Sequence, residues 1–238
     1  MSRFADFGVA GIRPDISAGE REWLYTASAS PNNSPPVYLP GGRVIDGTLA
    51  RDLANTPDIT SLRPGLPMGK VTTSGKYANS IIGATTGAYA DNDLVLQTSA
   101  AVAAEIVRRI GASGTVKLTG PPTAGGTVAT VSVAYTAVNT TTGVLTVPDL
   151  NAAFVSGSLI RPSDGSEVIK GGLDEWVRVT DDYGTNQDTR MRKLCVAGFA
   201  RAQQIIGYPA DSSLIAWLKA QFNDPTNGPG PFRFAENF

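Results

Sequence analysis

The sequence predicts a mainly β protein of the α+β class, with a β-barrel or β-sandwich-like body, one or two short helices and an extended N-terminal arm. Its 238 residues are 42% hydrophobic and 17% charged, which is enough apolar material for a substantial core. The 26 glycines and 16 prolines favour many turns, and therefore short strands rather than long helices. Apolar and polar residues alternate from Val131 to Ala137, which is the periodicity of a strand.

Residues 1–43 are expected to form the extended arm. Five prolines fix φ and remove backbone donors along this stretch. A solvated linker would not carry many large apolar groups, so these side chains must be buried on this domain or on a neighbour. The aromatic residues that we consider as contacts of the arm are Phe4, Phe7, Trp23, Tyr25 and Tyr38.

Residues 44–110 are expected to form the first part of a β-rich body. The run from Leu62 to Val71 holds two glycines and two prolines, which indicates an edge strand or a β-bend rather than a central strand. A helix is predicted over residues 99–110, where Val102, Ile106 and Ile110 recur at helical spacing. Ser99 is suited to cap its N-terminus, and Gly111 to end it.

Residues 111–167 are expected to form a Thr/Val-rich β insertion or subdomain. Between residues 111 and 165, charged side chains occur only at positions 117, 149, 161 and 164. The sequence Thr140-Thr-Thr-Gly143 predicts a turn between two strands. Pro148 and Asp149 predict a short helical turn that extends to Phe154.

Residues 168–222 are expected to form the second part of the body, and residues 223–238 a tail. Strands are predicted over 175–180 and 192–199, and a helix over 211–222 with Asp211 or Ser212 as its cap. The tail contains three aromatic residues, Phe232, Phe234 and Phe238. Two alternatives stay open for the tail, which either docks on a neighbouring subunit or returns to its own sheet.

The chain has no histidine and one cysteine, Cys195. This composition removes the Ser-His-Asp and Cys-His arrangements and the usual zinc sites. The acidic pair Asp91/Asp93 lies in a predicted turn, and Asp181/Asp182 lie in the predicted turn Asp181-Asp-Tyr-Gly184. Aspartate is favoured in turns for its hydrogen bonds to the backbone. We therefore expect no catalytic residue, no metal site and no cofactor.

Charge and hydropathy bear on partners and location. The net charge is −1 and no dense run of Lys and Arg occurs, so nucleic-acid binding is not expected. The first residues lack a long apolar core, and no window approaches the length of a membrane span. We expect synthesis in the cytoplasm, no signal peptide and no membrane association.

Several segments resemble structural proteins of tailed bacteriophages. The run from Ser61 to Val71, followed by Ser74-Gly-Lys-Tyr, is similar to a segment of phage head decoration (cement) proteins. The Thr/Val/Gly-rich region 115–147 and the segment from Phe154 to Glu167 resemble β-modules on virion surfaces. The resemblance spans about residues 60–185 and consists of short segments.

This resemblance implies a structural virion protein that binds the outer surface of a phage capsid. It implies the major capsid protein as partner and a homo-oligomer, with a trimer favoured, made in the host cytoplasm and located on the capsid surface. The arm would then supply the capsid contacts and the tail aromatics a subunit interface.

Three other classes of function remain open at this point. A tail-tube or baseplate component would also be β-rich. A carbohydrate-binding surface module would use an exposed aromatic residue such as Trp23 or Trp176. A glycosidase would need two carboxylates roughly 5–10 Å apart.

Overall fold

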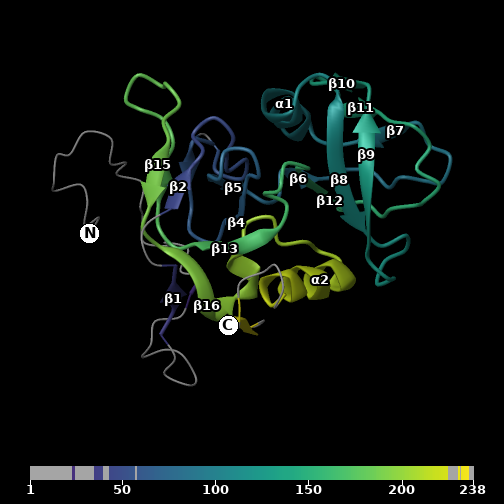
Figure 1. The fold of residues 1–238 in the computed structure, drawn as a ribbon. Helices are drawn as coiled ribbons and strands as arrows, with labels where there is room; N and C mark the ends of the chain where they lie inside the picture. The colour runs from purple at the N-terminus through teal and green to yellow at the C-terminus, as the bar shows by residue number, and fades with distance from the viewer. Residues whose placement is uncertain are drawn as a thin grey trace.

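The computed structural model describes residues 23–24, 35–39, 43–56, 58–224, 230 and 232–235. The chain is mainly β with two helices and a curled sheet, which confirms the predicted fold class. The body lies on one side of the molecule, and a second lobe formed by residues 82–161, here called the insertion lobe, lies beside it (Figure 1).

An eight-stranded sheet forms the body. Seven of its strands lie in the order β1, β16, β13, β4, β5, β2 and β15, and β17 pairs with β16 off this path. The bounds in that order are Val37–Tyr38, Leu194–Arg201, Ile169–Leu173, Pro67–Lys70, Tyr77–Asn79, Arg43–Ile45, Thr189–Met191 and, for β17, Phe232–Ala235. A small two-stranded sheet pairs β14 (Val177–Arg178) with β3 (Ser61–Leu62). The body core includes Ile45, Leu62, Met68, Leu173 and Met191.

The prediction for residues 62–71 was wrong in one respect, because β4 is a central strand between β13 and β5. Gly69 makes this position possible: a Cβ there would lie 1.9 Å from the backbone oxygen of Ser166. A side chain at this position would push the two backbones apart. The register between β4 and β13 also shifts between Ile169 and Gly171, so an irregularity accommodates the Gly/Pro-rich run.

The insertion lobe has its own core and two small sheets. The four-stranded sheet has the order β6 (Gly83–Ala84), β12 (Leu159–Arg161), β8 (Gly114–Gly120) and β9 (Ala129–Tyr135). The three-stranded sheet has the order β10 (Ala137–Asn139), β11 (Val144–Thr146) and β7 (Val95–Gln97). Helix α1 (Ala100–Arg109) packs Val102 and Ile106 into the same core as Leu118 and Leu145.

The lobe begins earlier than the insertion expected from residue 111. Its core contains side chains from Ile82 to Ile160, so β6, β7 and α1 belong to it. The change in composition at residue 111 marks a loss of charge and not the boundary of a core. The predicted helix is confirmed, with the Ser99 hydroxyl accepting a hydrogen bond from the amide of Val102.

Residues 148–154 form no helical turn, so that prediction was wrong. Phe154 instead forms an isolated bridge with Tyr89, and their amides and carbonyls pair in both directions at 2.8 Å. The strand expected over 175–180 is shorter, since only Val177–Arg178 pairs with β3.

Helix α2 (Ser212–Phe222) confirms the C-terminal helix, and Asp211 caps it by accepting from the amides of Ser213 and Leu214. A third core cluster joins the buried face of α2 to the body. The guanidinium of Arg161 lies 4.6 Å from the centre of the Trp217 ring, which links the insertion lobe to α2. A short 3-10 helix, Ala202–Gln204, follows β16.

Candidate functional site

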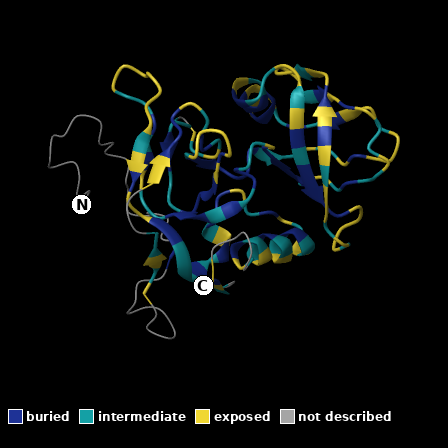
Figure 2. Cartoon of the chain, in the orientation of Figure 1, coloured by how far each residue is buried: buried dark blue, intermediate teal, exposed yellow. Residues whose placement is uncertain are grey.

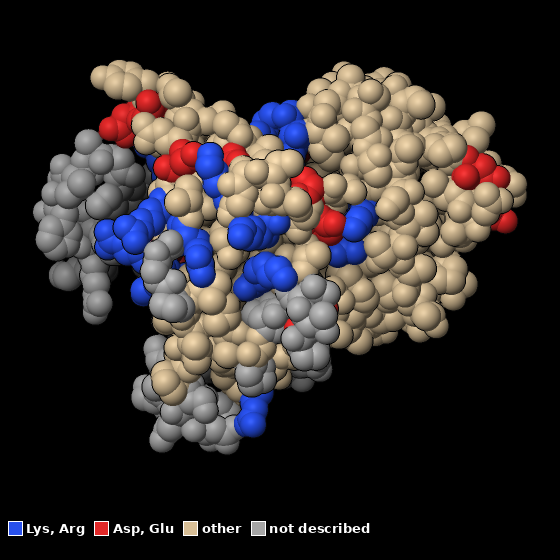
Figure 3. All heavy atoms as spheres, viewed as in Figure 1, with Lys and Arg blue, Asp and Glu red and all other residues tan. Residues whose placement is uncertain are grey.

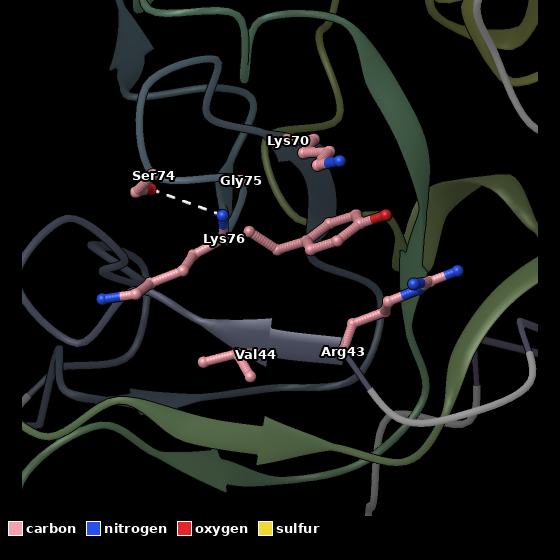
Figure 4. Close-up of a pocket in the computed structure, with 7 residues that line it drawn as sticks. Arg43, Val44, Lys70, Ser74, Gly75 and Lys76 are labelled. Carbon is pink, nitrogen blue, oxygen red and sulfur yellow. Dashed lines mark hydrogen bonds between the residues drawn. The ribbon is translucent and has the colours of Figure 1, made fainter.

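A shallow hollow of about 380 Å³ lies at the end of the body where β2, β4 and β5 meet (Figure 4). Three of the residues that line it are basic, one is aromatic, and the others are small or aliphatic. The lining residues are Arg43, Val44, Lys70, Ser74, Gly75, Lys76 and Tyr77.

Strand pairing and one tight turn build this hollow. Strands β2 and β5 run parallel through the pair Ile45 and Tyr77, and β4 places Lys70 opposite Tyr77. Between β4 and β5 the chain turns back, and Gly75 takes a φ of +69° that favours glycine. The amide of Gly75 donates to the carbonyl of Val71 at 2.9 Å, which closes the turn.

The hollow is positively charged. Lys76 is neutralised by Asp188, with Nζ and Oδ2 2.5 Å apart. Their hydrogen bond raises the pKa of Lys76 and lowers the pKa of Asp188. Arg43 and Lys70 are exposed and form no ion pair with another residue in the described ranges.

The hollow therefore holds two cations that have no ion-pair partner among the described residues, and they lie beside the Tyr77 ring and the Val44 methyl groups. Burial raises the pKa of Tyr77, so its hydroxyl stays protonated at neutral pH. The arrangement suits a carboxylate on an apolar or aromatic stem, which would pair with Arg43 or Lys70 and pack on the two apolar side chains.

Charge is unevenly distributed over the molecule. On the face shown in Figure 3, Lys and Arg gather over the body, whereas the insertion lobe shows few charged atoms. The exposed basic residues of the body include Arg43 on β2, Arg190 on β15, and Arg192 and Lys193 between β15 and β16.

A projecting turn carries the most exposed aromatic residue of the described chain. Tyr183 has 95% of its surface exposed, in a loop that is yellow in Figure 2. The Asp181 carboxylate accepts from the amides of Tyr183 and Thr185 at 2.9 and 2.8 Å, which fixes the loop. A rigid loop with an aromatic tip loses little entropy on contact with a partner.

One member of each acidic pair considered from the sequence orders its own turn. One Asp93 oxygen accepts from the amide of Ala90 at 2.8 Å, and Asp181 orders its loop as described above. No group of three or more Asp, Glu or Cys side chains within the described ranges is arranged to hold a metal ion.

Trp23 corrects the expectation for the arm. Its side chain is fully buried and packs against Phe222 and Phe232, with ring centres 6.2 and 5.8 Å away. Its carbonyl accepts from the amide of Arg201 at 2.7 Å, and Leu24 forms a bridge with Ala200. Trp23 is therefore a core residue, because β16 and α2 together enclose it.

Tyr38 also packs on the body, although part of its side chain remains exposed. Strand β1 pairs with β16, and the Tyr38 hydroxyl donates to the carboxylate of Asp174. Burial raises the pKa of Asp174. Phe4, Phe7 and Tyr25 lie outside the described residues.

The tail returns to its own sheet. Strand β17 runs parallel to β16, and Phe232 is 4% exposed. Phe234 is partly buried and stacks on Phe232 with ring centres 6.1 Å apart. This corrects the expectation that Phe232 contacts a neighbouring subunit, and Phe238 lies outside the described residues.

Cys195 is buried in the third core cluster. Burial raises the pKa of its thiol to about 12, so almost no thiolate is present at neutral pH. Its environment is that of a small apolar core residue.

The sequence did not single out the hollow or Tyr183. The hollow depends on pairings between strands that are distant in the chain. The sequence predicted a turn at Tyr183. An aromatic side chain within an otherwise polar turn was the feature that could have indicated an exposed contact residue.

Comparison with protein-family models, curated proteins and solved structures finds no match to this chain. None of the helices in the described ranges is long and apolar enough to cross a membrane.

Proposed function

We propose that the protein is a non-enzymatic structural component of a phage virion that binds the outer capsid surface and stabilises contacts between major capsid subunits. The observation that carries this proposal is the burial of Trp23 and Leu24 in the body core. The two residues that directly follow residues 1–22 are therefore held in the body core. A capsid contact made by residues 1–22 would be transmitted to the folded body through this anchor.

The sequence before this anchor contains Phe4 and Phe7. Ordering an arm costs about 1–2 kcal/mol of free energy per residue. Burial of each large apolar side chain contributes roughly 1.5–3 kcal/mol of stabilisation. A few aromatic contacts on a capsid subunit thus offset the ordering of short segments around them. Multiple copies on one shell increase the effective concentration of each contact.

The body offers a second contact region of complementary chemistry. The hollow has two cations, Arg43 and Lys70, that form no ion pair with another described residue, and Tyr183 projects on a loop ordered by Asp181. Acidic side chains on a capsid subunit would pair with the cations, while Tyr183 would supply apolar contact area.

The test is a deletion of residues 2–21, which keeps Trp23 and Leu24. We expect this variant to retain the thermal midpoint of the full chain within a few degrees, and to lose binding to DNA-free heads assembled from the major capsid protein of the phage that encodes it. Co-sedimentation and negative-stain images measure binding. Removal of residues 236–238 is the matched truncation control and should leave binding intact.

Two results would contradict the proposal. Unchanged binding after the deletion would show that the arm makes no capsid contact. Rings or tubes formed by the purified full chain alone would favour a tail-tube or baseplate component.

A carbohydrate-binding surface module is the second candidate, because two exposed aromatic residues flank β14: Trp176 directly precedes this strand and Tyr183 follows it in the connection to β15. Exposed aromatic rings can stack on sugar rings. Binding on a glycan array that is lost in Trp176→Ala and Tyr183→Ala, but kept in the deletion of residues 2–21, would favour this function.

A further inference from the structure

Strand β9 (Ala129–Tyr135) lies at the edge of its sheet in the described part of the chain. It pairs with β8 over all seven residues and with no other strand of the described chain. The outer N–H and C=O groups of an edge strand are a template for pairing with another strand. Proteins normally protect such edges with charged residues, proline, bulges or short strand length.

β9 carries none of these protections. Its sequence, Ala-Thr-Val-Ser-Val-Ala-Tyr, contains no charge, proline or glycine, and its register with β8 has no irregularity. The edge strands β1, β3, β6, β7, β10, β14 and β15 have two or three residues each, and β17 has four, including Arg233. β9 is therefore the long unprotected edge of the described chain.

We propose that two copies of the chain pair through β9 in antiparallel orientation, about a two-fold axis at Ser132. Ser132 is the central residue of the strand, so this register places Thr130 opposite Ala134 and Val131 opposite Val133. The four-stranded sheets of two insertion lobes become one continuous eight-stranded sheet.

The burial pattern fits this register. Thr130, Ser132 and Ala134 are exposed, whereas Val133 and Tyr135 are buried in the lobe core. Residues that face each other in an antiparallel pair point to the same side of the sheet. The two-fold pairing thus places the exposed residues Thr130 and Ala134 opposite each other and the half-buried Val131 opposite the buried Val133, and it continues both faces of the lobe.

Charge favours a second copy as the occupant. A two-fold axis places equivalent residues near one another, so a charged strand would repel itself. β9 is uncharged, and the cation beside it on β8, Lys117, is paired with Glu167 at 2.6 Å. The lobe shows few charged atoms in Figure 3, and depletion of charge is typical of interface cores.

This dimer goes beyond the proposed function, since β9 pairing requires no capsid and uses neither the arm nor the hollow. Antiparallel pairing of one strand with its own copy is two-fold. It gives a dimer, whereas the resemblance to decoration proteins implies a trimer.

Cysteine crosslinking tests the register. Ser132 is the residue of β9 that faces its own copy, and cross-strand Cβ atoms in antiparallel pairs lie about 4.5–5.5 Å apart, close to the distance that a disulfide bridges. The Ser132→Cys protein should form a covalent dimer under mild oxidation on a non-reducing gel. Ala134→Cys, which would face Thr130 of the other copy, should remain mostly uncrosslinked. The native Cys195 is buried and does not interfere.

Charge insertion tests the interface in solution. Light scattering of the full chain should give twice the 24.8 kDa mass of one chain. Ser132→Lys, which opposes two ammonium groups, should give a folded monomer by circular dichroism and a mass of one chain. Thr115→Lys adds the same charge at the exposed residue of β8, one strand away from the edge, and should remain dimeric.

The proposal is overturned if the full chain is a monomer at about 100 µM, if Ser132→Lys remains a dimer, or if both cysteine variants crosslink equally. The two proposals can fail separately. A Ser132→Lys protein that becomes a monomer supports the β9 interface, whether or not it binds capsids. If this monomer still binds capsids, the proposed function also stands.

Discussion

Arg109 on α1 donates from Nη2 to Oδ2 of Asp164 at 3.1 Å, which ties the insertion lobe to the segment through which the chain returns to the body. The same guanidinium donates to the Ser166 hydroxyl at 2.6 Å and to the carbonyl of Asn79 on β5 at 2.9 Å. The Arg109 side chain is fully buried. The Arg109 guanidinium thus holds three segments together at the junction of the body and the insertion lobe.

Replacing Asp164 with Asn should destabilise the protein at pH 7 by about 1–3 kcal/mol. This is less than the roughly 3–5 kcal/mol for breaking a fully buried pair, because 30% of the Asp164 side chain is exposed. Urea unfolding followed by circular dichroism measures the change. Asp182→Asn is the control, since Asp182 is 62% exposed in its pair with Arg178 and should have almost no effect.

The same variant has a predicted pH dependence. Burial opposes ionisation of Asp164, but Arg109 and the Ser166 hydrogen bonds outweigh it and lower the pKa of this carboxyl below its usual value of 3.8. The stabilisation is therefore complete above that value and is lost as the pH falls through the lower, folded-state pKa. The stability difference between Asp164→Asn and the native protein should shrink below pH 4. A difference that stays constant to pH 2 would contradict the ion pair.

Trp23→Ala should destabilise the protein by about 3–5 kcal/mol, because it leaves a large cavity beside Phe222 and Phe232. Trp176→Ala makes the same chemical change at a site that is 38% exposed, and we expect it to stay within about 0.5–1 kcal/mol. Equilibrium urea unfolding distinguishes them. Equal losses would show that Trp23 is not a core residue.

Gly69→Ala should destabilise the body, because a Cβ at this position meets the backbone oxygen of Ser166 at 1.9 Å. Backbone atoms cannot move aside as a flexible side chain can, so β4 and the 166–168 segment must separate. The control is Gly87→Ala, where the nearest atom, Cβ of Gln97, lies 3.4 Å away. A thermal midpoint lowered by several degrees in the first variant and hardly at all in the second is the expected result.

The Cys195 thiol should resist labelling in the native state at pH 8 and react fully in guanidinium chloride. Burial excludes the reagent, and a pKa of about 12 leaves very little thiolate. Thr115→Cys supplies an exposed thiol for comparison and should react at once. Native-state labelling of both thiols at similar rates would show that the third core cluster opens readily.

Local sequence patterns were sufficient for the secondary structure that depends on near neighbours. The helices at 100–109 and 212–222 followed from apolar spacing and from the caps Ser99 and Asp211. Gly143 and Gly184 take positive φ values in the turns where the sequence placed them. Each of these features is decided by hydrogen bonds and backbone conformations within a few residues.

The candidate site could be predicted only in part. The Asp181–Gly184 turn was predicted, but the exposure of Tyr183 depends on how far the loop projects from the body. Arg43 and Lys70 lie far apart in the chain and face one hollow because β2 and β4 both flank β5.

The sequence by itself determined that this is a mainly β protein without histidine chemistry, because composition and local periodicity do not depend on long-range contacts. Only the tertiary structure decided where the large apolar side chains are buried. Trp23 and Phe232 come from segments that looked like free ends, yet they meet at the same cluster beside α2. Burial is a property of segments that pack together, and the sequence pattern of one segment does not specify which other segment covers it.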